Sequence, residues 1–77
     1  MKITIYSQPA CQPCRLTKKL LDSKGLAYTE VDVLSDDAAY AYITEELGAR
    51  NVPVVVTDQG DVWKGIDQAR TGILALA

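Results

Sequence analysis

Two cysteines lie close together near the N-terminus of this 77-residue chain, in the motif Cys11-Gln12-Pro13-Cys14. Two thiols at this spacing can form a disulfide with each other, exchange it with another disulfide, or share a metal ion. A bridge across so short a loop stabilises a fold less than a long-range bridge does. The motif therefore favours redox chemistry or metal binding over a structural clamp.

A metal site at this pair would need ligands from elsewhere. Structural zinc is usually held by four ligands, most of them Cys or His. The chain has no histidine and no third cysteine, so zinc would require carboxylates or a second subunit. An iron–sulfur cluster bridging two chains with external thiols is a further alternative, as are two inert buried cysteines. We expect no cofactor beyond the cysteine pair itself.

The place of the pair in the chain indicates unequal roles for its two thiols. Cys11 falls where a predicted strand meets a predicted helix, and the free N–H groups and dipole of a helix N-terminus favour an anion such as a thiolate. Cys14 lies one turn further into the helix, where we expect it to be less exposed. We predict that Cys11 attacks a substrate disulfide and that Cys14 resolves the mixed disulfide. Gln12 and Pro13, between them, are candidate partner contacts, and Pro13 suits a first helical turn.

The elements that must position the cysteines follow from the alternation of apolar and polar residues. Residues 2–6 predict a first strand, residues 12–24 a helix that stops at Gly25, and residues 28–33 a second strand. The helix has leucines at helical spacing that predict its inward face: Leu16, Leu20 and Leu21.

The second half of the chain predicts a helix, a hairpin and a last helix. Ser35 is a candidate N-cap for a helix that ends at Gly48. Residues 54–57 and 62–64 predict the two strands of a hairpin. The last helix is expected to start from a cap at Asp67 and to run to about Leu76.

The predicted order is β-α-β-α-β-β-α, in a single domain of residues 1–77. A right-handed crossover makes the first two strands parallel, and the hairpin adds antiparallel strands to the same sheet. The predicted fold class is therefore α/β, with a four-stranded mixed sheet flanked by three helices on its two faces.

The composition excludes several classes of partner. The net charge of −2 argues against nucleic acid, and no apolar run approaches the roughly 20 residues that span a membrane. The N-terminus lacks the apolar segment of a secretory signal, so we expect a reducing cytoplasm, where a close cysteine pair is more often catalytic or metal-binding than structural. Nothing in the sequence demands more than a monomer.

A second group of candidate residues lies in the C-terminal half. Pro53 opens an apolar strand, a position that tolerates a residue without an N–H group. A cis Val52–Pro53 bond facing the cysteines would leave the Val52 backbone free to pair with an extended substrate. Trp63, the single tryptophan, is either a packing residue or, with Lys64, a contact for a partner protein. Gly65 is either a turn residue or a point of close backbone approach.

From about residue 2 to residue 74, the chain resembles the NrdH-redoxins, glutaredoxin-like proteins of the thioredoxin superfamily. The resemblance rests on these segments: Tyr6-Ser7-Gln8-Pro9-Ala10-Cys11-Gln12-Pro13-Cys14, Gly25-Leu26-Ala27-Tyr28, Val31-Asp32-Val33, Leu47-Gly48, Val52-Pro53-Val54-Val55 and Trp63-Lys64-Gly65-Ile66.

The resemblance implies a thioredoxin fold and delivery of electrons to ribonucleotide reductase. It also implies re-reduction by thioredoxin reductase, with NADPH used only by that reductase. By position, Cys11 is the nucleophile, Cys14 the resolving thiol and Pro53 the cis-proline, while the segment from Trp63 to Ile66 faces the partner.

The chain departs from the NrdH pattern near the partner surface. Where the family usually continues with Phe-Arg-Pro-Asp, this chain has Ile66-Asp67-Gln68-Ala69, and Gln8 stands where a basic residue is frequent. It also lacks the Gly-Gly pair of glutaredoxins, although Asp67 matches an acidic position there. A glutathione-dependent glutaredoxin is therefore the alternative function, and a non-enzymatic metal or iron–sulfur carrier is the second alternative.

Overall fold

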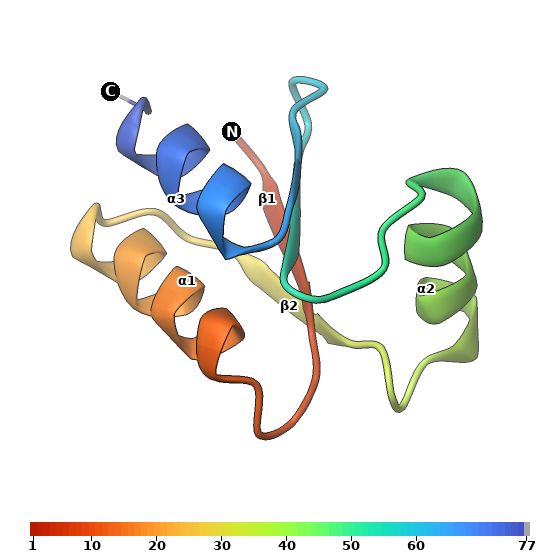
Figure 1. The fold of residues 1–77 in the computed structure, drawn as a ribbon. Helices are drawn as coiled ribbons and strands as arrows, with labels where there is room; N and C mark the ends of the chain where they lie inside the picture. The colour runs from red at the N-terminus through yellow and green to blue at the C-terminus, as the bar shows by residue number, and fades with distance from the viewer. Residues whose placement is uncertain (77) are drawn as a thin grey trace.

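The computed structural model describes residues 1–76, so Ala77, the last residue of the predicted domain, lies outside the described part. The elements follow the predicted order (Figure 1). Their bounds are β1 Ile3–Ser7, α1 Gln12–Ser23, β2 Thr29–Asp32, α2 Asp37–Ala41, a π-helical turn η1 Tyr42–Glu46, β3 Val54–Thr57, β4 Val62–Lys64 and α3 Ile66–Leu74.

The four strands form one mixed sheet in the order β2-β1-β3-β4. β1 is parallel to β2 and antiparallel to β3, and β3 is antiparallel to β4. Tyr6 in β1 lies opposite Val31 on one side and Val54 on the other. This is the topology predicted from the element order, and it brings the C-terminal end of β1 and the N-terminal end of β3 to the same end of the sheet.

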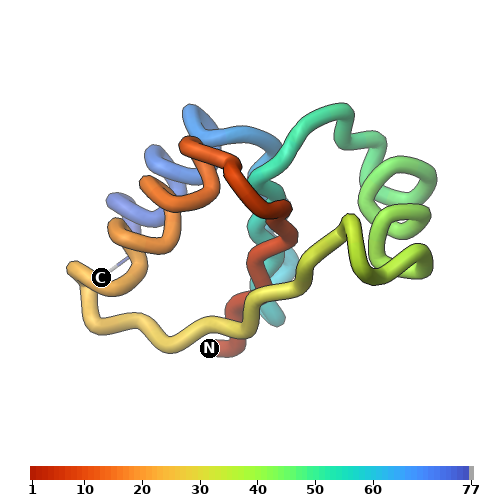
Figure 2. The backbone as a smooth tube through the Cα atoms, turned by 90° about the horizontal axis from the view of Figure 1, so that it is seen from below, coloured from red at the N-terminus to blue at the C-terminus, as the bar shows by residue number. Residues whose placement is uncertain are grey.

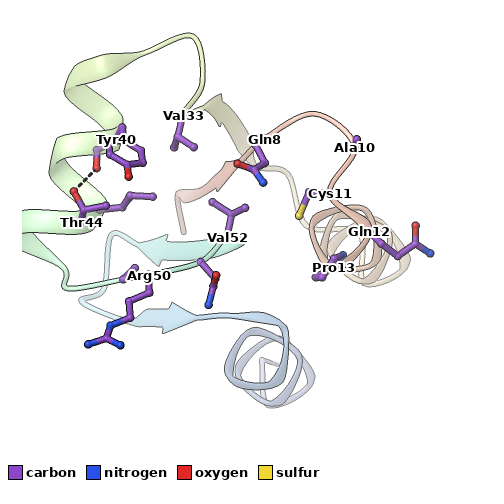
Figure 3. A pocket seen from close by; sticks show the side chains of 13 residues that line it. Gln8, Ala10, Cys11, Gln12, Pro13, Val33, Tyr40, Thr44, Arg50 and Val52 are labelled. Carbon is purple, nitrogen blue, oxygen red and sulfur yellow. Dashed lines mark hydrogen bonds between the residues drawn. The ribbon is translucent and has the colours of Figure 1, made fainter.

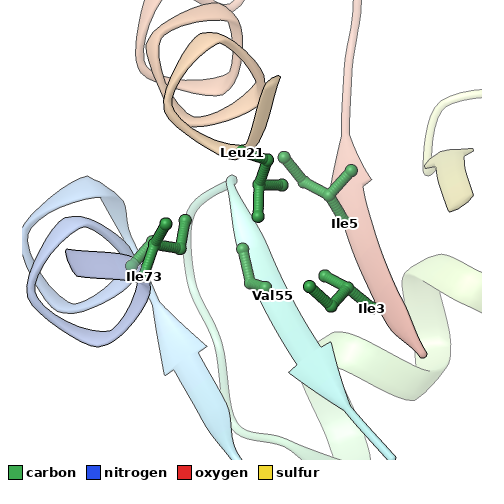
Figure 4. Close-up of a cluster of buried hydrophobic side chains, with 6 residues drawn as sticks. Ile3, Ile5, Leu21, Val55 and Ile73 are labelled. Atoms are coloured by element: carbon green, nitrogen blue, oxygen red, sulfur yellow. The ribbon is translucent and has the colours of Figure 1, made fainter. Parts of the chain in front are cut away.

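The helices cover both faces of the sheet, as expected. α1 and α3 lie side by side on one face, and α2 with η1 covers the other (Figures 1 and 2). The core under α1 and α3 is built from Ile3, Ile5, Leu21, Val55, Ala69 and Ile73 (Figure 4). The core under α2 and η1 contains Val33, Ala39, Ile43, Ala49 and Val54. Among residues 1–76, no helix is long and apolar enough to cross a membrane.

The inward face of α1 differs from the predicted leucine stripe. Leu16 is 49% exposed, whereas Cys14, Thr17 and Leu21 are buried. These three positions are spaced i, i+3 and i+7, which is one helical face, and Leu16 points away because it lies two residues from Cys14. The Thr17 hydroxyl donates a hydrogen bond to the carbonyl of Pro13 at 2.8 Å, so its burial leaves no unpaired polar group. Because Thr17 is polar, the apolar pattern alone did not indicate which face of α1 is buried.

The N-cap of α2 is Asp36, one residue later than the predicted Ser35. The Asp36 carboxylate accepts a hydrogen bond from the N–H group of Ala39 at 3.0 Å. Ser35 instead donates its hydroxyl to the carboxylate of Asp32 at 3.1 Å. Asp32, the last residue of β2, already binds the Ser35 hydroxyl in the following turn. The Asp36 carboxylate therefore accepts the free N–H group in the first turn of the helix.

Replacing Asp36 with alanine is expected to lower the free energy of unfolding by about 1 kcal/mol, the usual effect of losing an N-cap. The matched variant Ser35→Ala should change it by less than about 0.5 kcal/mol, since an exposed hydroxyl in a turn contributes little. Urea unfolding of both variants measures the difference. An equal loss in the two variants would contradict this assignment of the cap.

The last helix also differs from its prediction at both ends. It begins at Ile66, with Gly65 as the N-cap in a left-handed conformation (φ 86°), and Asp67 lies in the first turn. The early start follows because the amide of Gly65 is held by the carbonyl of Pro53 at 2.8 Å. At the other end α3 stops at Leu74, where the Lys24 ammonium binds the carbonyls of Leu74 and Leu76.

Candidate active site

Cys11 and Cys14 are joined in a disulfide at the N-terminus of α1, with their Cα atoms 5.3 Å apart. Cys11 is the N-cap residue, and its Sγ accepts a hydrogen bond from the N–H group of Cys14 at 3.2 Å. Its carbonyl accepts the N–H group of Arg15, also at 3.2 Å. A thiolate on Cys11 would therefore meet a helix N–H group and the positive end of the helix dipole, both of which favour it.

The turn that leads into Cys11 is unusually tight. Ala10 has φ 59°, in the left-handed region, which costs an alanine roughly 1 kcal/mol. Pro9 and Ala10 form the turn between β1 and α1, and both are exposed. The chain thus reverses within a few residues after β1 and places the Sγ of Cys11 at the cap position.

The two sulfurs differ in exposure in the way that their predicted roles require. Cys11 is 8% exposed and Cys14 is 1% exposed. An incoming disulfide can therefore approach Cys11, while Cys14 can be reached only from Cys11 or from inside the protein. The difference in exposure favours Cys11 over Cys14 as the residue that an incoming disulfide contacts first.

A groove of about 320 Å³ opens beside Cys11 on the side of α2. We call it the Val52 groove (Figure 3). Val52 lies across the groove from Cys11, and Gln8 lies on the wall between them. Its lining comprises Gln8, Ala10, Cys11, Gln12, Pro13, Val33, Tyr40, Ile43, Thr44, Ala49, Arg50, Asn51 and Val52. The lining mixes apolar and polar side chains.

A second hollow lies on the other side of the pair and is lined by Ser7, Gln8, Pro9, Ala10, Cys11, Cys14, Arg15, Lys18, Glu30 and Asp32. We call it the Glu30 hollow. Lys18 Nζ and Ser7 Oγ donate hydrogen bonds to the same oxygen, Glu30 Oε2, at 2.8 and 2.7 Å. These hydrogen bonds, from Lys18 first and Ser7 second, lower the pKa of the Glu30 carboxyl below its usual value. Glu30 is therefore ionised at neutral pH.

The glutaredoxin family model matches residues 3–62, well over half of the chain. This chain belongs to the glutaredoxin family. The glutaredoxin-like protein NrdH of Salmonella typhimurium is 39% identical over 67 residues, which cover 84% of this chain and 78% of that protein.

A solved NrdH-redoxin from Escherichia coli superposes with a TM-score of 0.81 and 28% identity, covering 100% of this chain and 99% of that one. That protein is described as glutaredoxin-like with a thioredoxin-like activity profile. The match confirms the predicted thioredoxin fold and the resemblance to the NrdH branch.

The gene 56 protein of Mycobacterium phage L5 is 45% identical over 56 residues, or 73% of this chain. The match covers 54% of that protein and 62% of its namesake in phage D29. This chain therefore spans about half to three fifths of the length of these curated relatives. The chain thus belongs to the glutaredoxin family and carries its Cys-x-x-Cys pair as a disulfide.

The other predicted residues of this glutaredoxin fall into two groups. Gln12, Pro13 and Val52 line the Val52 groove together with Cys11. Pro53 follows them, buried and with a cis Val52–Pro53 bond as the resemblance implied, and its carbonyl accepts the amide of Gly65. That hydrogen bond connects the Val52-Pro53 segment with the segment from Trp63 to Gly65.

Trp63 and Lys64 lie outside both the Val52 groove and the Glu30 hollow. Trp63 is half-buried and packs against the core under α1 and α3, which is the packing alternative for this residue. A Cβ atom on Gly72 of α3 would lie 2.1 Å from Trp63 Cε2, so Gly72 admits the indole ring. Lys64 is exposed, and its backbone N–H group donates to the Gln68 side chain at 2.8 Å.

Several residues beside the cysteines were not foreseen. Tyr40 and Thr44, which line the Val52 groove, lie one turn apart, and the Thr44 hydroxyl donates to the Tyr40 carbonyl at 2.9 Å (Figure 3). Arg50 lines the same groove from the loop before β3. Lys18 and Glu30 are 12 residues apart and meet only after α1 packs on the sheet. Lys18 follows Cys14 by one helical turn, whereas Tyr40, Thr44, Arg50 and Glu30 reach the site only through tertiary packing.

Tyr6, near the C-terminal end of β1, is a packing residue. It is half-buried against the core under α2, and its ring centroid lies 5.8 Å from that of Tyr42. Burial, with smaller contributions from Tyr42 and Asp36, raises the pKa of the Tyr6 phenol. A phenol that stays protonated suits packing.

Within residues 1–76, no cluster of three or more His, Cys, Asp or Glu side chains is placed to hold a metal ion.

Proposed function

We propose that this glutaredoxin is a dithiol electron donor to a protein disulfide, that ribonucleotide reductase is its acceptor, and that thioredoxin reductase re-reduces it. NADPH is then consumed only by the reductase, and this chain needs no cofactor beyond its cysteine pair. The proposal places the protein as a monomer in the reducing cytoplasm, where its dithiol form is maintained.

The observation that carries the proposal is the position of Cys11 at the head of the Val52 groove. The sulfur caps α1, where its thiolate is favoured, and the groove of about 320 Å³ beside it is lined by residues of α1, α2 and the loop before β3. A protein disulfide, unlike a small one, can use the whole groove.

Each step of the reaction uses a residue described above. The Cys11 thiolate attacks one sulfur of the partner disulfide and forms a mixed disulfide, while the other partner sulfur leaves as a thiolate. Cys14 then loses its proton and attacks Cys11, which releases the second partner thiol and closes the Cys11–Cys14 disulfide. We assign Gln12, Pro13 and Val52 to contacts with the partner segment during both steps. Thioredoxin reductase returns two electrons to the pair.

The choice of thioredoxin reductase rests on the resemblance to the NrdH-redoxins and on the full-length match to a relative with a thioredoxin-like activity profile. Trp63 and Lys64 occupy the place of the Gly-Gly pair that serves glutathione in glutaredoxins. The Trp63 indole packs on Gly72, so a bulky side chain held in the fold replaces the small residues of that pair.

A coupled NADPH-oxidation assay tests the electron source. The oxidised protein is supplied either with thioredoxin reductase or with glutathione and glutathione reductase, and a protein disulfide is the final acceptor. We expect turnover with thioredoxin reductase to exceed that with glutathione at least tenfold. Turnover only in the glutathione system would instead establish the alternative, a glutathione-dependent glutaredoxin.

The glutathione alternative has one observation in its favour. Asp67 is exposed in the first turn of α3, where glutaredoxins hold an acidic residue, and its partner there is Arg70 at 3.3 Å. The acceptor is tested separately, with ribonucleotide reductase assayed with the reduced protein as sole electron donor. Chelator-resistant iron or zinc in the purified protein, with no disulfide reduction, would favour the carrier function.

A further inference from the structure

An ion pair lies in the wall of the Glu30 hollow, beside the cysteines. Glu30 Oε2 accepts hydrogen bonds from Lys18 Nζ at 2.8 Å and from Ser7 Oγ at 2.7 Å. Ser7 is 2% exposed and therefore fixes that carboxylate from inside the protein. The Lys18 side chain is 26% exposed and that of Glu30 41%, so water screens the pair only in part.

Lys18 is a close neighbour of the resolving cysteine. It lies four residues after Cys14 on α1, and side chains at i and i+4 lie next to each other on one helical face. Both cysteines and Lys18 line the Glu30 hollow. The Lys18 ammonium therefore acts on any negative charge that the cysteine pair develops.

Three other charged residues line the Glu30 hollow or the Val52 groove, namely Asp32, Arg15 and Arg50. Asp32 faces the hollow from β2, but its oxygens accept hydrogen bonds from the Leu34 amide and the Ser35 hydroxyl. Arg15 faces the hollow from α1, and Arg50 and the Tyr40 phenol face the opposite groove. Among residues 1–76, only Lys18 and Glu30 form a salt bridge in the wall of either hollow.

Reduction changes the charge at this place. A dithiol reductant breaks the S–S bond and gives the pair two electrons, and it becomes a disulfide itself. One of its two protons goes to Cys14 and the other to solvent when Cys11 remains a thiolate. A free cation nearby stabilises that thiolate and favours the reduced form, whereas a nearby anion disfavours it.

We propose that Glu30 keeps this protein a strong electron donor by binding the Lys18 ammonium and cancelling its effect on the cysteine pair. Glu30 is then a tuning residue that acts through Lys18 and does not touch the substrate. The inference rests on the thiol–disulfide activity of the family and does not depend on the electron source proposed above.

The test uses Glu30→Gln, Lys18→Gln and the double variant. Glutamine at 30 keeps an oxygen that can accept the Ser7 hydroxyl. Each protein is equilibrated with mixtures of oxidised and reduced dithiothreitol, and the reduced fraction is counted by thiol alkylation. We expect Glu30→Gln to shift the equilibrium constant toward the dithiol at least about threefold, and Lys18→Gln to shift it about threefold toward the disulfide.

The double variant restores the local charge balance and is expected to return to within about twofold of the wild type. Lys18→Arg keeps the charge and should also stay close to the wild type. The pH dependence of alkylation gives a second measurement, because Glu30→Gln should lower the pKa of Cys11 and Lys18→Gln should raise it.

Matched controls are Lys2→Gln and Asp58→Asn, which change the net charge by the same amounts. Both residues are exposed and lie at the opposite end of the sheet, where the Asp58 amide donates to the Lys2 carbonyl at 3.0 Å. The inference is overturned when either single variant matches its control, or when both shift the equilibrium in the same direction. A wild-type protein that does not exchange with dithiothreitol would instead refute the redox activity itself.

Discussion

Replacement of Cys11 by serine is expected to lower disulfide reduction to the rate measured without protein. A hydroxyl cannot form a disulfide, so neither the mixed disulfide nor the resolving step can occur. Cys14 cannot substitute for Cys11, since it is 1% exposed and lies three residues after the N-cap, inside α1. The measurement is the reduction of a protein disulfide by dithiothreitol in the presence of each variant. Full activity in Cys11→Ser would refute the assigned roles.

Replacement of Cys14 by serine should give a different result. Cys11 remains at the helix cap with the N–H group of residue 14 directed at its sulfur, so the first attack still occurs. With no resolving thiol, the mixed disulfide accumulates and can be isolated under non-reducing conditions. Peptide mapping should find the partner attached at position 11. Attachment at position 14 in the Cys11→Ser protein at a comparable rate would reverse the assignment, and the double variant is the blank.

The position of the Cys11–Cys14 pair and the element order could be predicted because each depends on local sequence. Alternating strands and helical spacing are visible in short windows. The strand–helix junction at Cys11 is therefore visible too, whereas the unequal roles of the two thiols stay a prediction. The cis Val52–Pro53 bond is not indicated by any local sequence pattern, so its prediction depended on the family resemblance.

What the sequence did not reveal depends on which faces meet in the folded chain. Leu16 has the residue type of a core position and Thr17 does not, yet α1 buries Thr17 because its hydroxyl binds the Pro13 carbonyl. The cap of α2 moved from Ser35 to Asp36 because Asp32 already binds Ser35. Lys18 meets Glu30 only through packing of α1 on the sheet. A local side-chain hydrogen bond decided the first two cases, and an ion pair between α1 and β2 decided the third.

Replacement of Gly72 by alanine is expected to destabilise the protein by about 2 kcal/mol, although alanine is the better helix former. The new Cβ would lie 2.1 Å from Trp63 Cε2 and 2.5 Å from Cζ2. The indole cannot simply move aside, because Trp63 is fixed in β4 opposite Val55 and packs against the core under α1 and α3. Urea unfolding measures the loss, which is a large fraction of the total stability of so small a domain.

The Trp63→Leu background isolates the cause of that loss. With the indole removed, Gly72→Ala should be neutral or stabilising by up to about 1 kcal/mol, since only the helix preference for alanine remains. The double-mutant cycle should therefore give a coupling of about 2 kcal/mol between positions 63 and 72. An equal cost of Gly72→Ala in both backgrounds would show that something other than the indole occupies this space.

The same Trp63→Leu protein also separates packing from partner contact. A side chain that only packs changes stability and leaves the reduction rates of a small and of a protein disulfide in the same ratio, whereas a partner contact lowers the protein-disulfide rate alone.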